Sequence, residues 1–312
     1  AKIFAFFGAG VGLFGIGTFS QVNSIASAVK NFFDPDMAHT VTVLGNDYSI
    51  ATVIAGILLT VFVGLVVIGG IKRISKVSEV VVPFMAVLYV VLCLIIVFTN
   101  IKAVPGAFAE IISSAFNGSA LAGGVMGSMI VAMQKGVARG IFSNESGLGS
   151  APIAAAAAKT KEPVRQGLVS MTGTFIDTII ICTLTGLTLV VTNVWTGDLN
   201  GAALTQAAFT MGFPVWGKYL LMVGLVLFAF TTILGWNYYG ERCIEYLLGV
   251  KAILPYRIIF ICLIACGAFL KLEAIWVLAD IVNGLMAIPN LIALLGLTGV
   301  IVAETKRYTA HL

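Results

Sequence analysis

The chain has 312 residues, of which 59% are hydrophobic and 10% are charged, whereas soluble domains carry roughly 25% charged residues. Apolar stretches of about 20 residues recur along the whole length, each long enough to cross a hydrocarbon core of roughly 30 Å as a helix. A water-soluble globule is therefore excluded. The net charge of +4 is spread over several connections, which excludes nucleic acid as a partner.

The apolar segments predict eight membrane-spanning helices and hence an all-α integral membrane protein. They lie at residues 3–29, 50–71, 80–101, 121–141, 168–194, 216–239, 258–270 and 275–302. The seventh segment is short, because its 13 residues rise only about 20 Å as a helix. We expect Arg257 and Lys271 to reach the two membrane interfaces from its ends. The chain enters an apolar run at once, so we expect it to be part of a longer protein.

Charges in the connections predict the orientation of the chain. Basic residues gather after the second, fourth and sixth spans and in the tail at 304–312, namely Lys72, Arg73, Lys76, Lys159, Lys161, Arg165, Arg242, Lys251, Arg257, Lys306 and Arg307. The other connections hold one lysine each together with several acids. By the positive-inside rule, the first span runs outward and the C-terminus is cytoplasmic, so that the chain lies in the cell membrane as a multi-pass protein.

Residues 104–120 predict an external helix that lies in the membrane interface. Apolar side chains such as Phe108, Ile112 and Phe116 recur at helical spacing, with Glu110 and Asn117 among them. This amphipathic pattern is typical of helices that lie along a membrane surface.

The fourth span does not have the pattern of a plain membrane helix. Lys135 and Arg139 interrupt it, and Gly140, Gly147 and Gly149 follow. Irregular, polar backbone is tolerated at membrane depth only where protein buries it or where it lines a cavity. The pattern predicts a broken helix near 141–150 at a transport site, because freed backbone groups can bind a cation or a carboxylate. The alternative is an ordinary capped helix end on the cytoplasmic side.

Several motifs resemble the alanine or glycine:cation symporter family. The longest is Gly136-Val-Ala-Arg-Gly-Ile-Phe-Ser-Asn-Glu-Ser-Gly-Leu-Gly-Ser-Ala-Pro-Ile-Ala154, and Phe175-Ile-Asp-Thr178 follows it. Gly17-Thr-Phe-Ser-Gln-Val-Asn-Ser24 and Leu234-Gly-Trp-Asn-Tyr-Tyr-Gly240 support it. The resemblance runs from end to end of the chain.

The resemblance implies a fold and a function. Family members belong to the amino acid–polyamine–cation superfamily, and their LeuT-like core of two inverted five-helix repeats moves a small neutral amino acid with sodium or protons. The eight spans match core helices three to ten, so we expect residues 1–103 to hold the remainder of the first repeat and 121–303 to hold the second. The family's N-terminal helices have no counterpart here, and we do not expect this stretch alone to transport.

The same resemblance assigns substrate contacts to the predicted break. In the family, the unwound part of this helix faces the substrate, which implies contacts from Ile141, Phe142, Ser143 and Asn144. Phe142 is the expected lid over the substrate. The alternative for this ring is simple packing against protein or lipid.

A second set of site residues lies on the sixth span. Thr232 and Trp236 are four residues apart and therefore share one helix face. In LeuT-like proteins a hydroxyl pair on this helix binds sodium, which implies Thr231 and Thr232 as cation ligands, with Trp236 closing the substrate site. The alternative is that each hydroxyl bonds back to its own helix. On the first span, Gln21 either contacts the substrate or links two helices.

Two carboxylates, Asp177 and Asp280, lie inside apolar runs, where an acid is a functional hypothesis by default. We expect salt bridges or a gate latch with Lys135 or Arg139, with proton coupling as the second interpretation. Glu145 is expected to bond freed N–H groups at the break. From another class, the two aspartates suggest an intramembrane hydrolase, although neither stands in a Gly-x-Gly-Asp motif.

The predicted function is therefore symport of alanine or glycine with a cation, by alternating access, and not an enzymatic reaction. The expected coupling ion is sodium, and the alternative is the proton. We expect no cofactor and no metal other than sodium. A channel is a third interpretation, but it would more naturally show a repeated pore loop than one broken helix.

Overall fold

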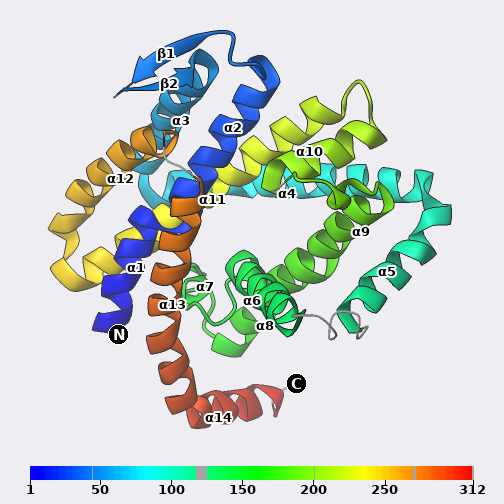
Figure 1. The fold of residues 1–312 in the computed structure, drawn as a ribbon. Helices are drawn as coiled ribbons and strands as arrows, with labels where there is room; N and C mark the ends of the chain where they lie inside the picture. The colour runs from blue at the N-terminus through cyan, green and yellow to red at the C-terminus, as the bar shows by residue number, and fades with distance from the viewer. Residues whose placement is uncertain (44, 117–124, 200, 270–271, 311–312) are drawn as a thin grey trace. The chain divides into compact units, whose positions relative to one another are not determined.

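The computed structural model of the chain describes residues 1–43, 45–116, 125–199, 201–269 and 272–310 and is mostly helical (Figure 1). Its α-helices are α1 (Lys2–Phe14), α2 (Gln21–Phe33), α3 (Ile50–Ile68), α4 (Gly70–Thr99), α5 (Val104–Phe116), α6 (Val125–Asn144), α7 (Ala151–Ala155), α8 (Pro163–Thr174), α9 (Thr183–Val191), α10 (Gly201–Gly212), α11 (Gly217–Leu248), α12 (Ile253–Gly267), α13 (Leu272–Gly296) and α14 (Thr298–Thr309). Two π-helices, η1 (Ile16–Ser20) and η4 (Phe175–Cys182), join α1 to α2 and α8 to α9. Short 3₁₀ turns form η2 (Ile101–Ala103), η5 (Val194–Thr196) and η6 (Val250–Ala252).

Seven helical stretches in the described residues are long and apolar enough to cross a membrane. They are Lys2–Phe33, Ile50–Ile68, Gly70–Thr99, Pro163–Val191, Gly217–Leu248, Val250–Gly267 and Val277–Gly296. Each overlaps a predicted span, which confirms a multi-pass membrane protein. The remaining predicted span, 121–141, corresponds to α6, and its residues 121–124 lie outside the described residues. Because Lys135 and Arg139 make α6 less apolar, its membrane crossing stays a prediction.

Some predicted boundaries were wrong. The third span was predicted from residue 80, but α4 begins at Gly70 and therefore includes Lys72 and Lys76. The seventh was predicted at 258–270, whereas the helical stretch runs from Val250 to Gly267. It includes Arg257, whose charge is paired within the protein, as described below.

The ends of two other predicted elements also changed. The last predicted span, 275–302, divides into α13 and α14, and the second of these covers most of the predicted tail at 304–312. Residues 311 and 312 of that tail lie outside the described residues. The predicted interfacial helix at 104–120 corresponds to α5, whose last described residue is Phe116, and residues 117–120 lie outside the description.

A small β-hairpin departs from the predicted all-α class. Strands β1 (Thr40–Val43) and β2 (Asn46–Ser49) pair antiparallel, with Thr40 opposite Ser49. Alternating Thr and Val favour a strand, and Gly45 takes a φ of 81°, which suits the turn between them. The Ser49 side chain donates to Asp34 Oδ2 (2.5 Å), and the Tyr48 hydroxyl donates to Phe269 O (3.1 Å). The hairpin is therefore held by two hydrogen bonds, one to Asp34 after α2 and one to Phe269 after α12.

By its internal contacts the chain divides into two compact units. Unit 1 comprises Ala1–Met85, Gly147–Ser170 and Met222–Leu312, and unit 2 comprises Ala86–Ser146 and Met171–Leu221. Each unit is described by itself below.

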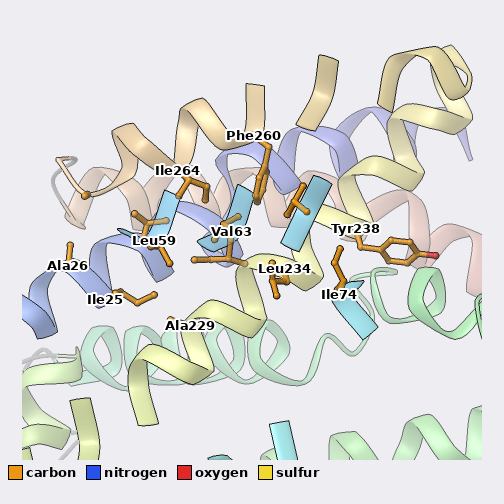
Figure 2. Close-up of a cluster of buried hydrophobic side chains, with 14 residues drawn as sticks. Ile25, Ala26, Leu59, Val63, Ile74, Ala229, Leu234, Tyr238, Phe260 and Ile264 are labelled. Atoms are coloured by element: carbon orange, nitrogen blue, oxygen red, sulfur yellow. The ribbon is translucent and has the colours of Figure 1, made fainter. Parts of the chain in front are cut away.

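The core of unit 1 forms where α2, α3, α11 and α12 meet (Figure 2). Its buried members recur every three or four residues along each helix, as expected for one apolar face. They include Val22 and Ile25 of α2, Leu59 and Val63 of α3, Ile233 and Leu234 of α11, and Phe260 and Ile264 of α12. Side chains from four helices thus fix the position of α11, which carries several predicted site residues.

One tyrosine fixes α1 against its neighbours in unit 1. The Tyr256 hydroxyl of α12 donates to Ala9 O of α1 (2.9 Å). A Cβ added at Gly12 would lie 2.4 Å from this hydroxyl oxygen, and one added at Gly240 of α11 would lie 1.8 Å from it. Small residues let membrane helices approach closely, and here the space they leave is filled by one phenol.

Unit 2 has its own core, built on the C-terminal half of α4. Cys93 and Ile96 are fully buried and pack against Phe209 of α10. The Tyr89 ring stacks on Phe209 with centroids 5.6 Å apart, and its hydroxyl is 2.8 Å from Thr185 Oγ1 on α9. A second cluster joins α4 and α5 to α9.

Candidate transport site

The first candidate span is broken in its middle. Helix α1 ends at Phe14, Gly15 adopts an extended conformation (φ −74°, ψ 176°), and the π-helix η1 follows. The Thr18 hydroxyl, fully buried, donates across the break to Gly12 O (2.7 Å). π-helical turns are often found at functional sites. The motif from Gly17 to Ser24 covers part of this segment, but no break was predicted here.

Trp236 of α11 packs directly on this broken segment. A Cβ added at Gly17 would lie 1.8 Å from Cδ1 of the Trp236 ring, so only glycine leaves room for the indole. Trp236 is 2% exposed, and its ring meets Tyr239 edge to face at 5.5 Å. Among the predicted site residues of unit 1, Trp236 is thereby placed against the interrupted backbone. Gln21, which is half-buried, comes four residues after Gly17 in the sequence.

Thr231 and Thr232 use their hydroxyl protons within their own helix. Thr231 Oγ1 lies 3.1 Å from Leu227 O and 3.0 Å from Phe228 O, and Thr232 Oγ1 donates to Phe228 O (2.9 Å). This is the alternative weighed for them in the sequence analysis. Donation leaves the oxygen lone pairs available as acceptors, so these bonds do not remove either hydroxyl as a cation ligand.

The glycine-rich segment after α6 is not helical. Glu145, Gly147 and Gly149 all have positive φ, at 57°, 81° and 88°. Within unit 1, Asn290 Nδ2 of α13 donates to Gly147 O (3.0 Å). A Cβ added at Gly149 would lie 2.6 Å from the Phe4 ring of α1. A side chain of α13 thus holds a carbonyl group that is not part of a helix.

In unit 2, the end of α6 is bound to the π-helix η4. Ser143 Oγ donates to Asp177 Oδ1 (2.8 Å), and Asn144 Nδ2 donates to Thr178 Oγ1 (3.0 Å). Thr178 Oγ1 also lies 3.3 Å from Asp177 Oδ2. Two predicted substrate residues are therefore joined to a predicted latch residue, although the latch partner expected for Asp177 was a basic side chain.

The remaining predicted residues differ in their exposure. Ile141 is 37% exposed and Phe142 is half-buried at the end of α6. Lys135 lies on the exposed part of α6, Arg139 and Glu145 are half-buried, and Asp280 is half-buried on α13. The latch pairs proposed for them stay predictions. The predicted site residues fall into two sets, Gln21, Thr231, Thr232, Trp236 and Asp280 in unit 1, and Lys135, Arg139, Ile141, Phe142, Ser143, Asn144, Glu145 and Asp177 in unit 2.

A buried glutamate of unit 1 forms an ion pair that was not predicted from the sequence. Glu241 of α11 is 1% exposed and binds Arg257 of α12 through two hydrogen bonds, Nε to Oε1 (2.6 Å) and Nη2 to Oε2 (2.8 Å). The fully buried Asn237 side chain donates to Glu241 Oε1 (2.6 Å). The signal was present, because Glu241 stands one turn after Asn237 in the sequence. It was missed because the sixth span was predicted to end at residue 239 and Arg257 was counted among the charges of the connection that follows.

Comparisons with known proteins agree with the motifs. The sequence model of the sodium:alanine symporter family matches residues 1–312. An uncharacterized transporter of Haemophilus influenzae is 54% identical over 100% of this chain and 66% of its own length. The sodium/alanine symporter AgcS of Methanococcus maripaludis is 50% identical over 98% of this chain and 64% of its own length.

A more distant relative is the probable sodium/glutamine symporter GlnT of Bacillus subtilis, which is 41% identical over 81% of this chain and 53% of its own length. The chain spans about two thirds of the length of the first two relatives and about half of the third. The family match covers every motif on which the resemblance was based. The chain belongs to the sodium:alanine symporter family, a family of transporters and not of enzymes.

Proposed function

We propose that the chain forms a large part of a sodium-coupled symporter for a small neutral amino acid, alanine or glycine. The observation that carries this proposal is the broken backbone at Gly15, with the Trp236 ring packed on Gly17 and Thr232 one turn before Trp236 on the same helix. A broken helix inside a membrane offers backbone groups to ions and carboxylates, and an indole beside it is a suitable wall for a small apolar side chain.

The proposed architecture is the LeuT-like bundle, with eight spans equivalent to core helices three to ten. In this proposal α6 is the fourth span, and the discontinuous helix is broken near 141–150, of which 141–144 still belong to α6 and 145–149 are not helical. Residues 1–103 and 121–303 are assigned to the two inverted repeats, with α5 at the outer interface and α14 in the cytoplasm. Family membership supports this assignment, and the basic residues of α14 agree with the positive-inside rule.

Substrate and ion sites are assigned to the two sets of residues. Gln21, Ile141, Phe142, Ser143, Asn144, Thr232 and Trp236 contact the amino acid, and Thr231 and Thr232 bind the cation. Sodium is a hard cation that prefers oxygen ligands, and the lone pairs of both hydroxyls remain after donation. Substrate and ion together stabilise an occluded state, and the sodium gradient drives the cycle.

Asp177 is assigned a latch function rather than catalysis. It accepts from Ser143, so that the end of α6 and the π-helix η4 are held together in unit 2. The hydrolase alternative is excluded by membership in a transporter family. Proton coupling through Asp177 remains the competing ion assignment and is separated from sodium coupling by the experiment below.

The test is uptake of labelled alanine and glycine into proteoliposomes that hold the complete parent protein, with an inward gradient of sodium or of protons. We expect sodium to drive accumulation, and Thr232→Val to reduce it at least tenfold. Thr60→Val is the matched control, because the Thr60 hydroxyl of α3 donates to Gly56 O (2.7 Å) in the same way.

Three outcomes contradict parts of the proposal. Accumulation driven by protons without sodium would assign the coupling ion to the proton. An equal loss in Thr60→Val and Thr232→Val would mean that the Thr232 hydroxyl only supports its helix. Correctly inserted protein without uptake of either amino acid would remove alanine and glycine as substrates.

A further inference from the structure

The end of α1 leaves polar backbone groups within a candidate membrane span. The last four carbonyls of an α-helix have no partner inside the helix. Here Val11 O accepts from Gly15 N (2.7 Å) and Gly12 O accepts from the Thr18 hydroxyl (2.7 Å). The carbonyls of Leu13 and Phe14 are the other two of this set. They lie at the negative end of the helix dipole, which favours a cation.

Helix α13 runs beside α1 in the opposite direction (Figure 1). A Cβ added at Gly8 of α1 would lie 3.8 Å from Met286 Sδ, and one added at Gly149 would touch both Phe4 and Asn290. Phe4 is thus level with Asn290, and Gly8 is level with Met286. Because the two helices are antiparallel, each residue further along α1 toward Gly15 lies level with a residue further back along α13.

Asn283 of α13 faces the end of α1. It lies three residues before Met286 and seven before Asn290, on the stripe that packs on α1. Val11 lies seven residues after Phe4, and α1 ends three residues later, at Phe14. Because both helices rise about 1.5 Å per residue, the side chain of Asn283 is level with the last carbonyls of α1.

The Asn283 amide oxygen has no hydrogen-bond partner among the described residues. The side chain is nearly buried, with the residue 7% exposed. A buried acceptor of this kind requires an explanation, because most such groups in proteins are satisfied. Thr18 Oγ1, on the other side of the break, is fully buried and retains its lone pairs after donation to Gly12 O.

The local charge also favours a cation. The sequence has no basic residue between Lys2 and Lys30, nor between Lys271 and Lys306. Asp280 lies three residues before Asn283, on an adjacent position of the helix surface.

We propose that the end of α1, together with Asn283 Oδ1 and Thr18 Oγ1, forms a binding site for a monovalent cation, with sodium as the ion that this oxygen set favours. The site goes beyond the proposed function, whose cation ligands are Thr231 and Thr232. It binds sodium without the amino acid and holds α13 against the broken segment of the first span.

The test measures the thermal unfolding midpoint of the complete parent protein in detergent, as sodium chloride replaces N-methyl-D-glucamine chloride at constant ionic strength. A ligand that binds the folded state raises this midpoint. We expect sodium to raise it saturably, and Thr232→Val to retain a sodium-dependent rise. Thr232→Val/Asn283→Leu is expected to lose that rise, because leucine fills the space without an oxygen.

The matched control is Thr232→Val/Met286→Leu, which changes a buried residue on the same stripe of α13 without removing an oxygen and should keep the sodium response. Thr232→Val/Thr18→Val replaces the test variant if leucine at 283 prevents folding. The proposal is overturned if Thr232→Val alone abolishes the response, or if both test variants still respond to sodium. A sodium response in a protein that transports no amino acid would leave this site standing and reject the symport proposal.

Discussion

Arg257 of α12 holds Glu241 of α11 by a bidentate ion pair in which the glutamate side chain is 1% exposed and the arginine side chain is 18% exposed. Asn237 donates to the same carboxylate, and Arg257 Nη1 also lies 3.5 Å from Ile68 O at the end of α3. Planar, two-point pairing is the geometry that arginine forms best with a carboxylate. Three helices are therefore joined at one charged centre.

Removal of one partner from this pair should destabilise the protein strongly. We expect Arg257→Leu to lower the free energy of unfolding by about 3–5 kcal/mol, because the buried carboxylate loses both hydrogen bonds of its bidentate partner. It would keep the bond from Asn237 and the longer contact with Arg242 Nη2 at 3.8 Å. Detergent denaturation of the purified parent protein measures this. Glu245→Gln is the control, since the Arg242–Glu245 pair has side chains 35% and 29% exposed and pairs of this kind contribute about 0–1 kcal/mol. Equal effects of the two variants would contradict the prediction.

The anchor of the β-hairpin should make stability depend on pH. The hydrogen bond from Ser49 is the main cause that lowers the pKa of Asp34 from 3.8, against an opposing effect of burial. The ionised carboxylate therefore stabilises the fold above 3.8, and this contribution is lost as the pH falls through the lowered pKa.

Asp34→Asn is the variant that reveals this dependence. The difference in unfolding midpoint between the parent protein and Asp34→Asn should be full at neutral pH and should shrink below pH 3.8. Asp36→Asn, at an exposed position two residues further on, should change the midpoint little. A difference that stays constant down to acidic pH would show that the charge of Asp34 has no part in the anchor.

A methyl group at Gly17 should impair transport. The added Cβ of Gly17→Ala would overlap the Trp236 ring at 1.8 Å, so either η1 or the indole must move. We expect uptake by the parent protein to fall on the order of tenfold, which corresponds to about 1.4 kcal/mol. Gly10→Ala is the matched control, because a Cβ there meets nothing within 4 Å. Normal uptake by Gly17→Ala would remove the contact with Trp236 from the proposed site.

Loss of the Ser143 hydroxyl should weaken the latch in unit 2. It donates to Asp177 Oδ1 at 2.8 Å, and a partly exposed bond to a charged group contributes about 1 kcal/mol. Uptake by Ser143→Ala should fall several-fold. Ser114→Ala removes a comparable bond, from Ser114 Oγ to Glu110 Oε1 at 3.0 Å on α5, and should leave uptake unchanged. If both variants transport alike, the latch assignment fails.

The sequence predicted the helices well because each apolar run identifies a membrane-spanning helix by its own length and composition. The start of α12 was misplaced because Arg257 was interpreted as a loop residue. Its charge is tolerated inside the helical stretch only because Glu241, 16 residues earlier, lies opposite it. The hairpin was missed because its four-residue strands are too short to stand out beside long apolar segments.

The candidate site could be predicted only in part. Motif resemblance identified Ser143, Asn144 and Asp177 as separate residues, but their hydrogen bonds depend on how α6 packs against η4. The break at Gly15 was not predicted, since glycines in a membrane helix are equally well explained by close packing. The unpartnered oxygen of Asn283 can be recognised only from three-dimensional contacts.

The single hydroxyl of Tyr256 anchors the part of the first span that precedes Gly15. It binds Ala9 O and fills the space that Gly12 and Gly240 leave, so α1 cannot slide or turn without expelling a buried phenol. The extended residue Gly15 comes directly after this anchored region. The two sides of Gly15 are therefore held by different contacts: α1 by the Tyr256 hydroxyl, and α2 by the core that Val22 and Ile25 share with α3, α11 and α12.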